Sequence, residues 1–252
     1  IISDDLATMT YRTVGRQISP LIIRTRGHRL EGIWHAGSPM GMLLNSIKGV
    51  RILVPRNMTQ AAGMYNTLLD CNEPSLLVEP LNSYRLKEKM PSNIGEFKVP
   101  LGVVEYIHYG EDITVVSYGS TLRIAEKACI ELKTHGISVD LIDIQTLIPF
   151  DDNNQIISSL KKTNKLVIVD EDYNGGASAF ILKKIIEDQN GYQFLDSKPK
   201  TITSKDHRPP YGSDGDYFSK PSQDDIFEGI YNLMNEYNPK KYPLNFRFWF
   251  RK

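Results

Sequence analysis

The sequence predicts an α/β fold made of two open, mostly parallel sheets with helices on both faces. Short apolar runs alternate with segments of helical spacing along most of the chain. The turns between these segments are short, as in successive βαβ units. The chain has 252 residues, enough for about two domains at roughly 100–200 residues each.

The first half contains one such unit. Residues 20–25, 50–55 and 75–80 are apolar runs that predict buried strands, and residues 59–69 have helical spacing. Strand, helix and strand in this order favour a parallel sheet. Residues 1–10 also have helical spacing, which predicts a helix already under way. We therefore expect the chain to be part of a longer polypeptide.

The pattern restarts after residue 104. Strands are predicted at 113–118, 139–143, 166–170 and 201–203, and helices at 119–134, 151–160, 175–189 and 223–236. Residues 81–104 have little periodicity and contain prolines, as in an interdomain linker. The predicted division is 1–80, a linker at 81–104, a second domain at 105–238 and a basic, aromatic tail at 239–252, either disordered or docked on a partner.

Composition excludes several classes of protein. The 30 Lys and Arg residues balance 30 Asp and Glu residues, which argues against a nucleic-acid-binding surface. No window approaches the roughly 18 apolar residues of a membrane span. Cys71 and Cys129 are too few for a disulfide framework and fit a reducing, cytoplasmic location.

His35 is the main candidate for chemistry. It lies in the loop Gly32–Pro39, after the strand predicted at 20–25, and ligands of open parallel sheets bind beyond the carboxyl ends of strands. The pKa of a histidine allows proton transfer near neutral pH. A structural histidine that hydrogen-bonds to the backbone is the alternative.

Two further turns follow predicted strands. Glu171–Ser178 contains two glycines before a helix and could hold a phosphate, although a plain strand-to-helix turn explains it as well. In Tyr118–Thr121, a serine or threonine is expected to cap the next helix. The sequence has no P-loop, no nucleophile elbow and no metal-ligand spacing of cysteine and histidine, so no metal site is predicted.

Several stretches together resemble a known family. They are Pro20–Arg24, Trp34–Pro39, Leu53–Pro55, Glu73–Pro80, Ile142–Phe150, and Val169–Glu171 with Gly175–Gly176. In this order and spacing they resemble the beta subunit, or the beta-like half of a fused chain, of the thiamine-diphosphate-dependent first component of 2-oxoacid dehydrogenases. The resemblance covers roughly residues 1–235, and its specificity comes from the joint pattern.

The resemblance implies a fold and an activity. Residues 1–80 would be part of a pyrimidine-binding domain, and residues 105–238 a transketolase C-terminal domain. The implied reaction decarboxylates a 2-oxoacid on thiamine diphosphate and transfers the acyl group to a lipoyl domain. His35 falls on the family's histidine near the reacting end of the cofactor, where it would transfer a proton or stabilise charge.

The sequence departs from the family at its loop. The family usually has His-Ser-Gln-Ser-Pro-Glu, whereas residues 35–40 read His-Ala-Gly-Ser-Pro-Met. The glutamate that activates the cofactor would precede Ile1, and the ligands of diphosphate and Mg²⁺ belong to the alpha part. We therefore expect the cofactor-binding residues outside this chain, and the chain alone to be inactive.

The implied partners are an alpha subunit or alpha-like half, a second copy of the chain and a lipoyl-bearing acyltransferase. No nucleic acid and no membrane are expected. A branched-chain 2-oxoacid is favoured on resemblance, and pyruvate is possible. Two alternatives stay open: a non-catalytic dimerisation or docking module, and a transketolase-like deoxyxylulose-phosphate synthase fragment, for which Arg26, His28 and Arg29 could bind a phosphate.

Overall fold

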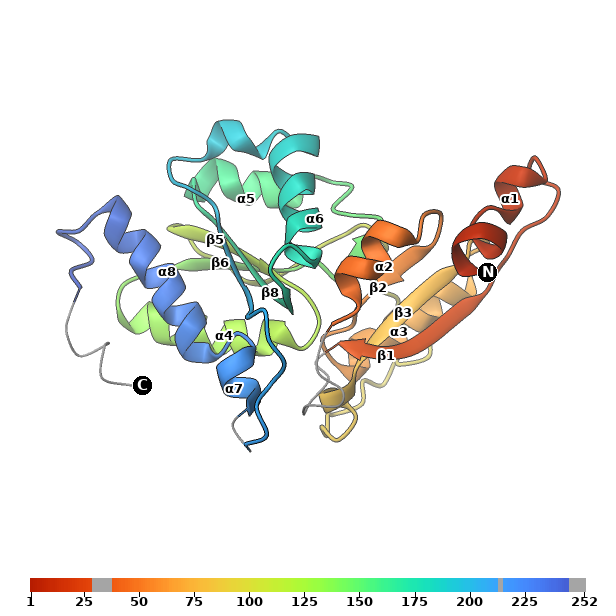
Figure 1. The fold of residues 1–252 in the computed structure, drawn as a ribbon, viewed down its shortest axis with the longest axis horizontal. Helices are drawn as coiled ribbons and strands as arrows, with labels where there is room; N and C mark the ends of the chain where they lie inside the picture. The colour runs from red at the N-terminus through yellow and green to blue at the C-terminus, as the bar shows by residue number, and fades with distance from the viewer. Residues whose placement is uncertain (29–37, 213–214, 245–252) are drawn as a thin grey trace.

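The computed structural model describes residues 1–28, 38–212 and 215–244. These residues form two sheets with helices packed on them (Figure 1). Within this part of the chain, antiparallel pairing is confined to two edge strands, β4 (Glu105–His108) and β7 (Thr146–Ile148). The predicted α/β class with two mostly parallel sheets is confirmed.

The first sheet has the order β1–β3–β2–β7. Its parallel strands are β1 (Ile22–His28), β3 (Ser75–Pro80) and β2 (Arg51–Leu53). Side chains alternate between the two faces of a strand. Leu76 accordingly faces α2 (Met40–Ser46), whereas Leu77 faces α3 (Met58–Leu69).

The second sheet has the order β4–β6–β5–β8–β9. Its parallel strands are β5 (Ile113–Ser117), β6 (Val139–Asp143), β8 (Leu166–Tyr173) and β9 (Lys200–Ser204). Its helices are α4 (Thr121–Thr134), α5 (Gln155–Thr163), α6 (Ala177–Lys183), α7 (Gly215–Ser219) and α8 (Gln223–Tyr237). The strand order reverses between β5 and β8, which makes their carboxyl ends a place where ligands of such sheets bind.

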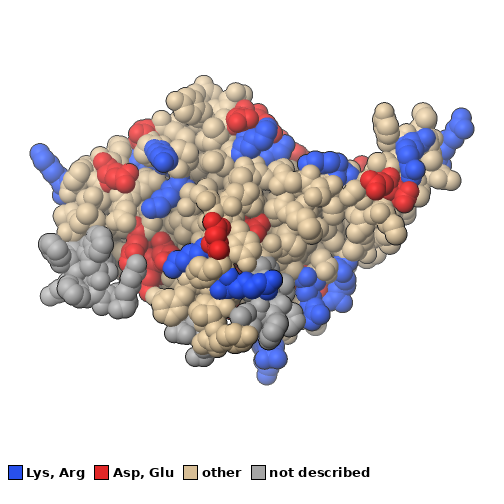
Figure 2. Space-filling view, in the orientation of Figure 1, with Lys and Arg blue, Asp and Glu red and all other residues tan. Residues whose placement is uncertain are grey.

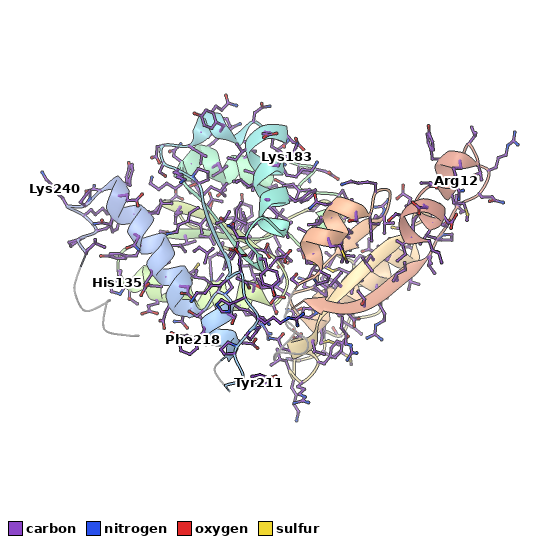
Figure 3. The ribbon with its side chains drawn as sticks, viewed as in Figure 1. Arg12, His135, Lys183, Tyr211, Phe218 and Lys240 are labelled. Carbon is purple, nitrogen blue, oxygen red and sulfur yellow. The ribbon has the colours of Figure 1, made fainter. Side chains whose placement is uncertain are left out.

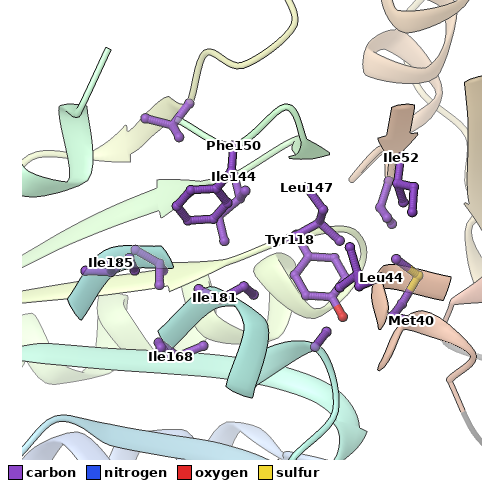
Figure 4. Close-up of a cluster of buried hydrophobic side chains, with 14 of the residues drawn as sticks. Met40, Leu44, Ile52, Tyr118, Ile144, Leu147, Phe150, Ile168, Ile181 and Ile185 are labelled. Carbon is purple, nitrogen blue, oxygen red and sulfur yellow. The ribbon is translucent and has the colours of Figure 1, made fainter. Parts of the chain in front are cut away.

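The two sheets are joined by strand pairing and by a shared core. Strand β7 follows β6 in the chain but pairs with β2 of the first sheet. Met40 and Leu44 of α2 pack in one cluster with Tyr118 and Ile181 of the second half (Figure 4). Burying a side chain of this size contributes about 1.5–3 kcal/mol, so each half stabilises the other.

A buried ion pair also crosses between the halves. Arg56 follows β2, and its Nη1 lies 2.7 Å from Glu105 Oε2 and 2.8 Å from Asp143 Oδ2. The Asp143 side chain is 1% exposed, and burial raises its pKa to about 6. Removing Arg56 would leave a buried carboxyl without its charged partner.

Residues 81–104 pack on α3 for part of their length. The Asn66 side chain donates to the carbonyls of Ile94 and Phe97, both at 2.8 Å. The Thr67 hydroxyl donates to the carbonyl of Val99 at 2.7 Å. Much of this segment is therefore held against the first sheet's helix.

The two ends of the described chain lie at opposite ends of the molecule. Residues 2–12 form two short helical turns, η1 (Ile2–Leu6) and α1 (Met9–Arg12), at the end where Figure 3 labels Arg12. Lys240 is labelled at the other end. In the predicted tail, Tyr242 is buried against Tyr231 of α8.

Both basic and acidic side chains are scattered over the face seen in Figure 2, most of which is formed by other residues. Among the described residues, no helix is long and apolar enough to cross a membrane.

The connection from β4 to β5 rests on a buried carboxylate. Asp140 of β6 is fully buried and accepts hydrogen bonds from the Gly110 amide at 2.6 Å and from the Ser159 hydroxyl at 2.6 Å. Lys162 Nζ lies 2.9 Å from the same carboxylate. A Cβ on Gly110 would lie 2.3 Å from the backbone of Val139, so the connection passes directly over the start of β6.

We expect Gly110→Ala to destabilise the protein by about 1–3 kcal/mol, because backbone rather than a flexible side chain would have to move. Urea unfolding measures the change. Gly95→Ala is the control, since a Cβ there would meet nothing within 4 Å. Equal stability of the two variants would contradict this account of the connection.

Candidate active site

Two buried aspartates at the end of β8 organise the junction between the halves. Asp170 accepts hydrogen bonds from the Tyr118 hydroxyl at 2.6 Å and from the amides of Asp172 and Ser178 at 3.0 and 2.8 Å. These donors come from the end of β5, from β8 itself and from α6. The carboxylate therefore ties three elements together at the point where the strand order reverses.

Asp172 makes the corresponding link to the first half. Its Oδ2 accepts from the amide of Gly41 in α2 at 2.7 Å and from the amide of Ala177 in α6 at 3.1 Å. A Cβ on Gly41 would lie 2.8 Å from the Gly176 Cα. The first turns of α2 and α6 can approach this closely because both positions are glycine.

The described residues on either side of 29–37 meet beside this junction. Gly27 of β1 lies against Pro39, where an added Cβ would come within 2.8 Å of the proline Cγ. Pro39 immediately precedes α2, and Gly41 is bonded to Asp172. The predicted catalytic residue His35 falls within 29–37 and lies outside the described residues, so its role stays a prediction.

Burial shifts the pKa values of the acidic side chains at the junction. Burial raises the pKa of Asp170 from 3.8 to about 7, although three hydrogen bonds favour its charged form. Burial also raises the pKa of Asp172, and burial beside Asp170 raises the pKa of Tyr118. Asp170 thus changes charge near neutral pH.

The glycine turn at Glu171–Ser178 is a plain strand-to-helix turn rather than a phosphate site. The amides of Ala177 and Ser178, at the start of α6, donate to Asp172 and Asp170. The chain's own carboxylates therefore occupy the place where a phosphate would bind. The sequence signal for this arrangement is the pair of aspartates two residues apart before Gly175.

The predicted cap on α4 is wrong. Ser120 stands at the N-cap position, but its side chain makes no capping bond. The hydroxyls of Ser120 and Thr121 are both buried, and neither has a hydrogen-bond partner among the described residues. The helix thus begins without a side-chain cap, between the buried residues Tyr118 and Leu122.

The residues proposed for phosphate binding in the synthase alternative are only partly described. Arg26 and His28 lie at the end of β1, and Arg29 lies outside the described residues. In the part of the chain that the structure describes, no group of three or more His, Cys, Asp or Glu could hold a metal ion.

The Asp170 pKa has a consequence for stability. Its folded-state value of about 7 is above its ordinary value of 3.8, so folding favours the protonated form. The stability that this adds is fully present below about pH 4 and is lost as the pH rises through about 7. One proton can change the unfolding free energy by at most about 1.4 kcal/mol per pH unit.

We expect Asp170→Asn to remove this pH dependence of the unfolding free energy. The variant should therefore lose more unfolding free energy relative to the native protein at low pH than at high pH. Urea unfolding between about pH 5 and pH 8 measures the difference. Asp143 titrates in both proteins and cancels in the comparison. The exposed Asp4→Asn serves as the control. A difference in unfolding free energy between the native protein and Asp170→Asn that is constant across this range would show that Asp170 does not titrate there.

Comparison with known proteins supports the fold and the family. The family described as "Transketolase, C-terminal domain" matches residues 102–222. A solved structure described as a split gene transketolase, inactive beta4 tetramer, has a TM-score of 0.68 at 16% identity. The match covers 91% of this chain and 74% of that one, and at this identity it shows the fold alone.

Three relatives are beta subunits. Pyruvate dehydrogenase E1 component subunit beta of Acholeplasma laidlawii is 28% identical over 229 residues, 90% of this chain and 68% of that protein. Acetoin:2,6-dichlorophenolindophenol oxidoreductase subunit beta of Bacillus subtilis (strain 168) is 29% identical over 91% of this chain and 66% of that protein. Mitochondrial 2-oxoisovalerate dehydrogenase subunit beta 2 of Arabidopsis thaliana is 30% identical over 81% of this chain and 55% of that protein.

The chain thus spans between about half and two thirds of the length of these relatives. The matches support the resemblance predicted from the sequence: the chain is similar to E1 beta subunits of 2-oxoacid dehydrogenases, and its residues 102–222 match the transketolase C-terminal domain.

Proposed function

We propose that the chain is part of a 2-oxoacid dehydrogenase first component that decarboxylates a 2-oxoacid and passes the acyl group to a lipoyl domain. The observation that carries the proposal concerns the described residues that flank segment 29–37. Its described neighbours Gly27 and Pro39 touch, and Gly41 is bonded to Asp172 across the junction. This arrangement holds the base of a histidine-bearing loop at the carboxyl edges of two sheets.

Thiamine diphosphate with Mg²⁺ would supply the carbanion chemistry in the full assembly. The described residues do not form its site by themselves. Asp170 and Asp172 are buried and use their oxygens to accept hydrogen bonds from the chain's own groups. We therefore assign cofactor and metal binding to an alpha subunit or alpha-like half and to residues outside this chain, and derive no step through them.

The role proposed for this chain is local. His35 transfers a proton or stabilises charge while the lipoyl group is acylated, because near neutral pH an imidazole accepts a proton in its neutral form and donates one in its protonated form. A second copy of the chain and a lipoyl-bearing acyltransferase complete the assembly, in the cytoplasm. A branched-chain 2-oxoacid is the favoured substrate and pyruvate is the alternative; 2-oxoisovalerate in the name of one relative supports the first and pyruvate in the name of another supports the second.

We expect His35→Ala in the full-length assembly to lower acyl transfer to a lipoyl acceptor by about 10²–10⁴-fold, the usual contribution of a general acid or base. Decarboxylation measured with an artificial electron acceptor should fall less. The control is His135→Ala. His135 lies on the side of the second half that is away from the first half (Figure 3).

Normal lipoyl acylation by His35→Ala would rule out the proposed role of His35. Activity on sugar phosphates but not on 2-oxoacids would favour the synthase alternative. An assembly that forms but turns over neither substrate class would favour the docking module.

The anchoring itself is tested by Gly41→Ala. The added Cβ would meet Gly176 Cα at 2.8 Å and Asp172 Oδ2 at 3.0 Å, so α2 must move away from α6. We expect at least a tenfold loss of lipoyl acylation, of the order that a displacement of about 1 Å causes. An unfolding midpoint measured beside the rate separates misfolding from misplacement. Unchanged activity would show that this contact does not position the loop.

A further inference from the structure

A cavity of about 420 Å³ opens between α3 and the carboxyl ends of β2 and β3. Glu79 in its wall lies two residues after Leu77, so both side chains point to the α3 side of the first sheet. The Gly41–Asp172 contact joins α2, on the other face of this sheet, to the second half. The cavity is therefore separate from the candidate active site, and its volume is typical of small-molecule sites, about 300–1,000 Å³.

Hydrocarbon forms much of the wall. The apolar lining residues are Pro55, Met58, Ala61, Ala62 and Pro80. Ala61 is buried and Ala62 is half-buried, whereas Met58 is 49% exposed and therefore stands at the opening. A charged group that enters this space loses its hydration, and these side chains offer nothing in return. The part of a ligand that fills the cavity must therefore be apolar.

The charged groups of the wall neutralise each other. Arg24 Nη2 lies 2.6 Å from Glu79 Oε2, and Arg24 Nε lies 3.1 Å from Glu79 Oε1. The hydroxyls of Tyr65 and Tyr84 donate to the same carboxylate, the first at 2.6 Å. Both oxygens of Glu79 are thus held by donors of this chain. The wall therefore requires neither a cationic nor an anionic ligand.

Asn57 contributes a directed donor to the same cavity. It is the N-cap of α3, and its Oδ1 accepts a hydrogen bond from the Gln60 amide at 2.8 Å. Because this bond uses the amide oxygen, the side-chain NH₂ group is left for another partner. Among the described residues, this NH₂ group makes no hydrogen bond. An uncharged oxygen of a ligand can accept a hydrogen bond at this place.

We propose that this cavity binds a small uncharged molecule made of a hydrocarbon body and one hydrogen-bond acceptor, such as a ketone. The body lies against Ala61 and Ala62, and the acceptor oxygen takes a hydrogen bond from the Asn57 side chain. The site goes beyond the proposed function, because it uses none of the residues assigned to lipoyl acylation.

NMR titration of the full-length protein with acetophenone, ethylbenzene and phenylacetate, which share one carbon skeleton, tests the proposal. We expect both neutral probes to bind. Phenylacetate should bind at least about tenfold more weakly than acetophenone, because its charge must leave water. Ala62→Leu should weaken both neutral probes by about tenfold or more, because the added side chain fills the cavity. Ala179→Leu, on an exposed position of α6, is the matched control.

The donor is tested by Asn57→Asp, which keeps an acceptor for the helix cap but removes the side-chain NH₂ group. This variant should weaken acetophenone by about threefold to tenfold, the range expected for one hydrogen bond. It should change the affinity for ethylbenzene, which has no acceptor, by less than about twofold. The unfolding midpoint of each variant separates a loss of folding from a loss of binding.

Four results would overturn the proposal. They are binding of neither neutral probe, phenylacetate binding as tight as that of acetophenone, unchanged affinities in folded Ala62→Leu, and equal effects of Asn57→Asp on the two neutral probes.

Discussion

The structure depends on two buried carboxylates that replace solvent at the junction of its halves. Asp170 and Asp172 accept hydrogen bonds from the ends of β5 and β8, from α6 and from α2. A buried amide without a partner costs about 1–3 kcal/mol, and the aspartates satisfy several at once. The same contacts determine how close α2 comes to α6, and hence where the chain leaves and re-enters the segment that carries His35.

Packing reinforces this polar junction. Met40 and Leu44 lie in one apolar cluster with Tyr118, whose hydroxyl also bonds to Asp170 (Figure 4). Arg56 crosses to Asp143 nearby. An apolar core alone tolerates sliding, whereas directed hydrogen bonds set one arrangement. The combination gives the loop base a defined position, as the proposed proton transfer by His35 requires.

Sequence periodicity predicted the regular elements well and the irregular ones poorly. Residues 75–80 and 139–143 coincide with β3 and β6, because continuous apolar runs mark buried strands. The short edge strands β4 and β7 were missed: each pairs with residues far away in the chain, and local pattern carries no such information. Helix α2 (Met40–Ser46), directly after the loop predicted over Gly32–Pro39, was also missed. For the site, the sequence singled out Glu171–Ser178, but it could not show that Asp172 also accepts a hydrogen bond from Gly41, since that contact depends on how α2 docks. The position of His35 remains predicted from family resemblance.

The crossing of β7 has a consequence for synthesis of the protein. Ile52 pairs with Ile148, so the first sheet cannot be completed until the ribosome has delivered residues from the second half. Domains that emerge first usually fold first. Here, however, the edge of β2 has no partner until β7 is made, and an unpaired strand edge can pair with other chains. Until residues 146–148 have been made, β2 is therefore an unprotected edge, however stable the finished molecule is.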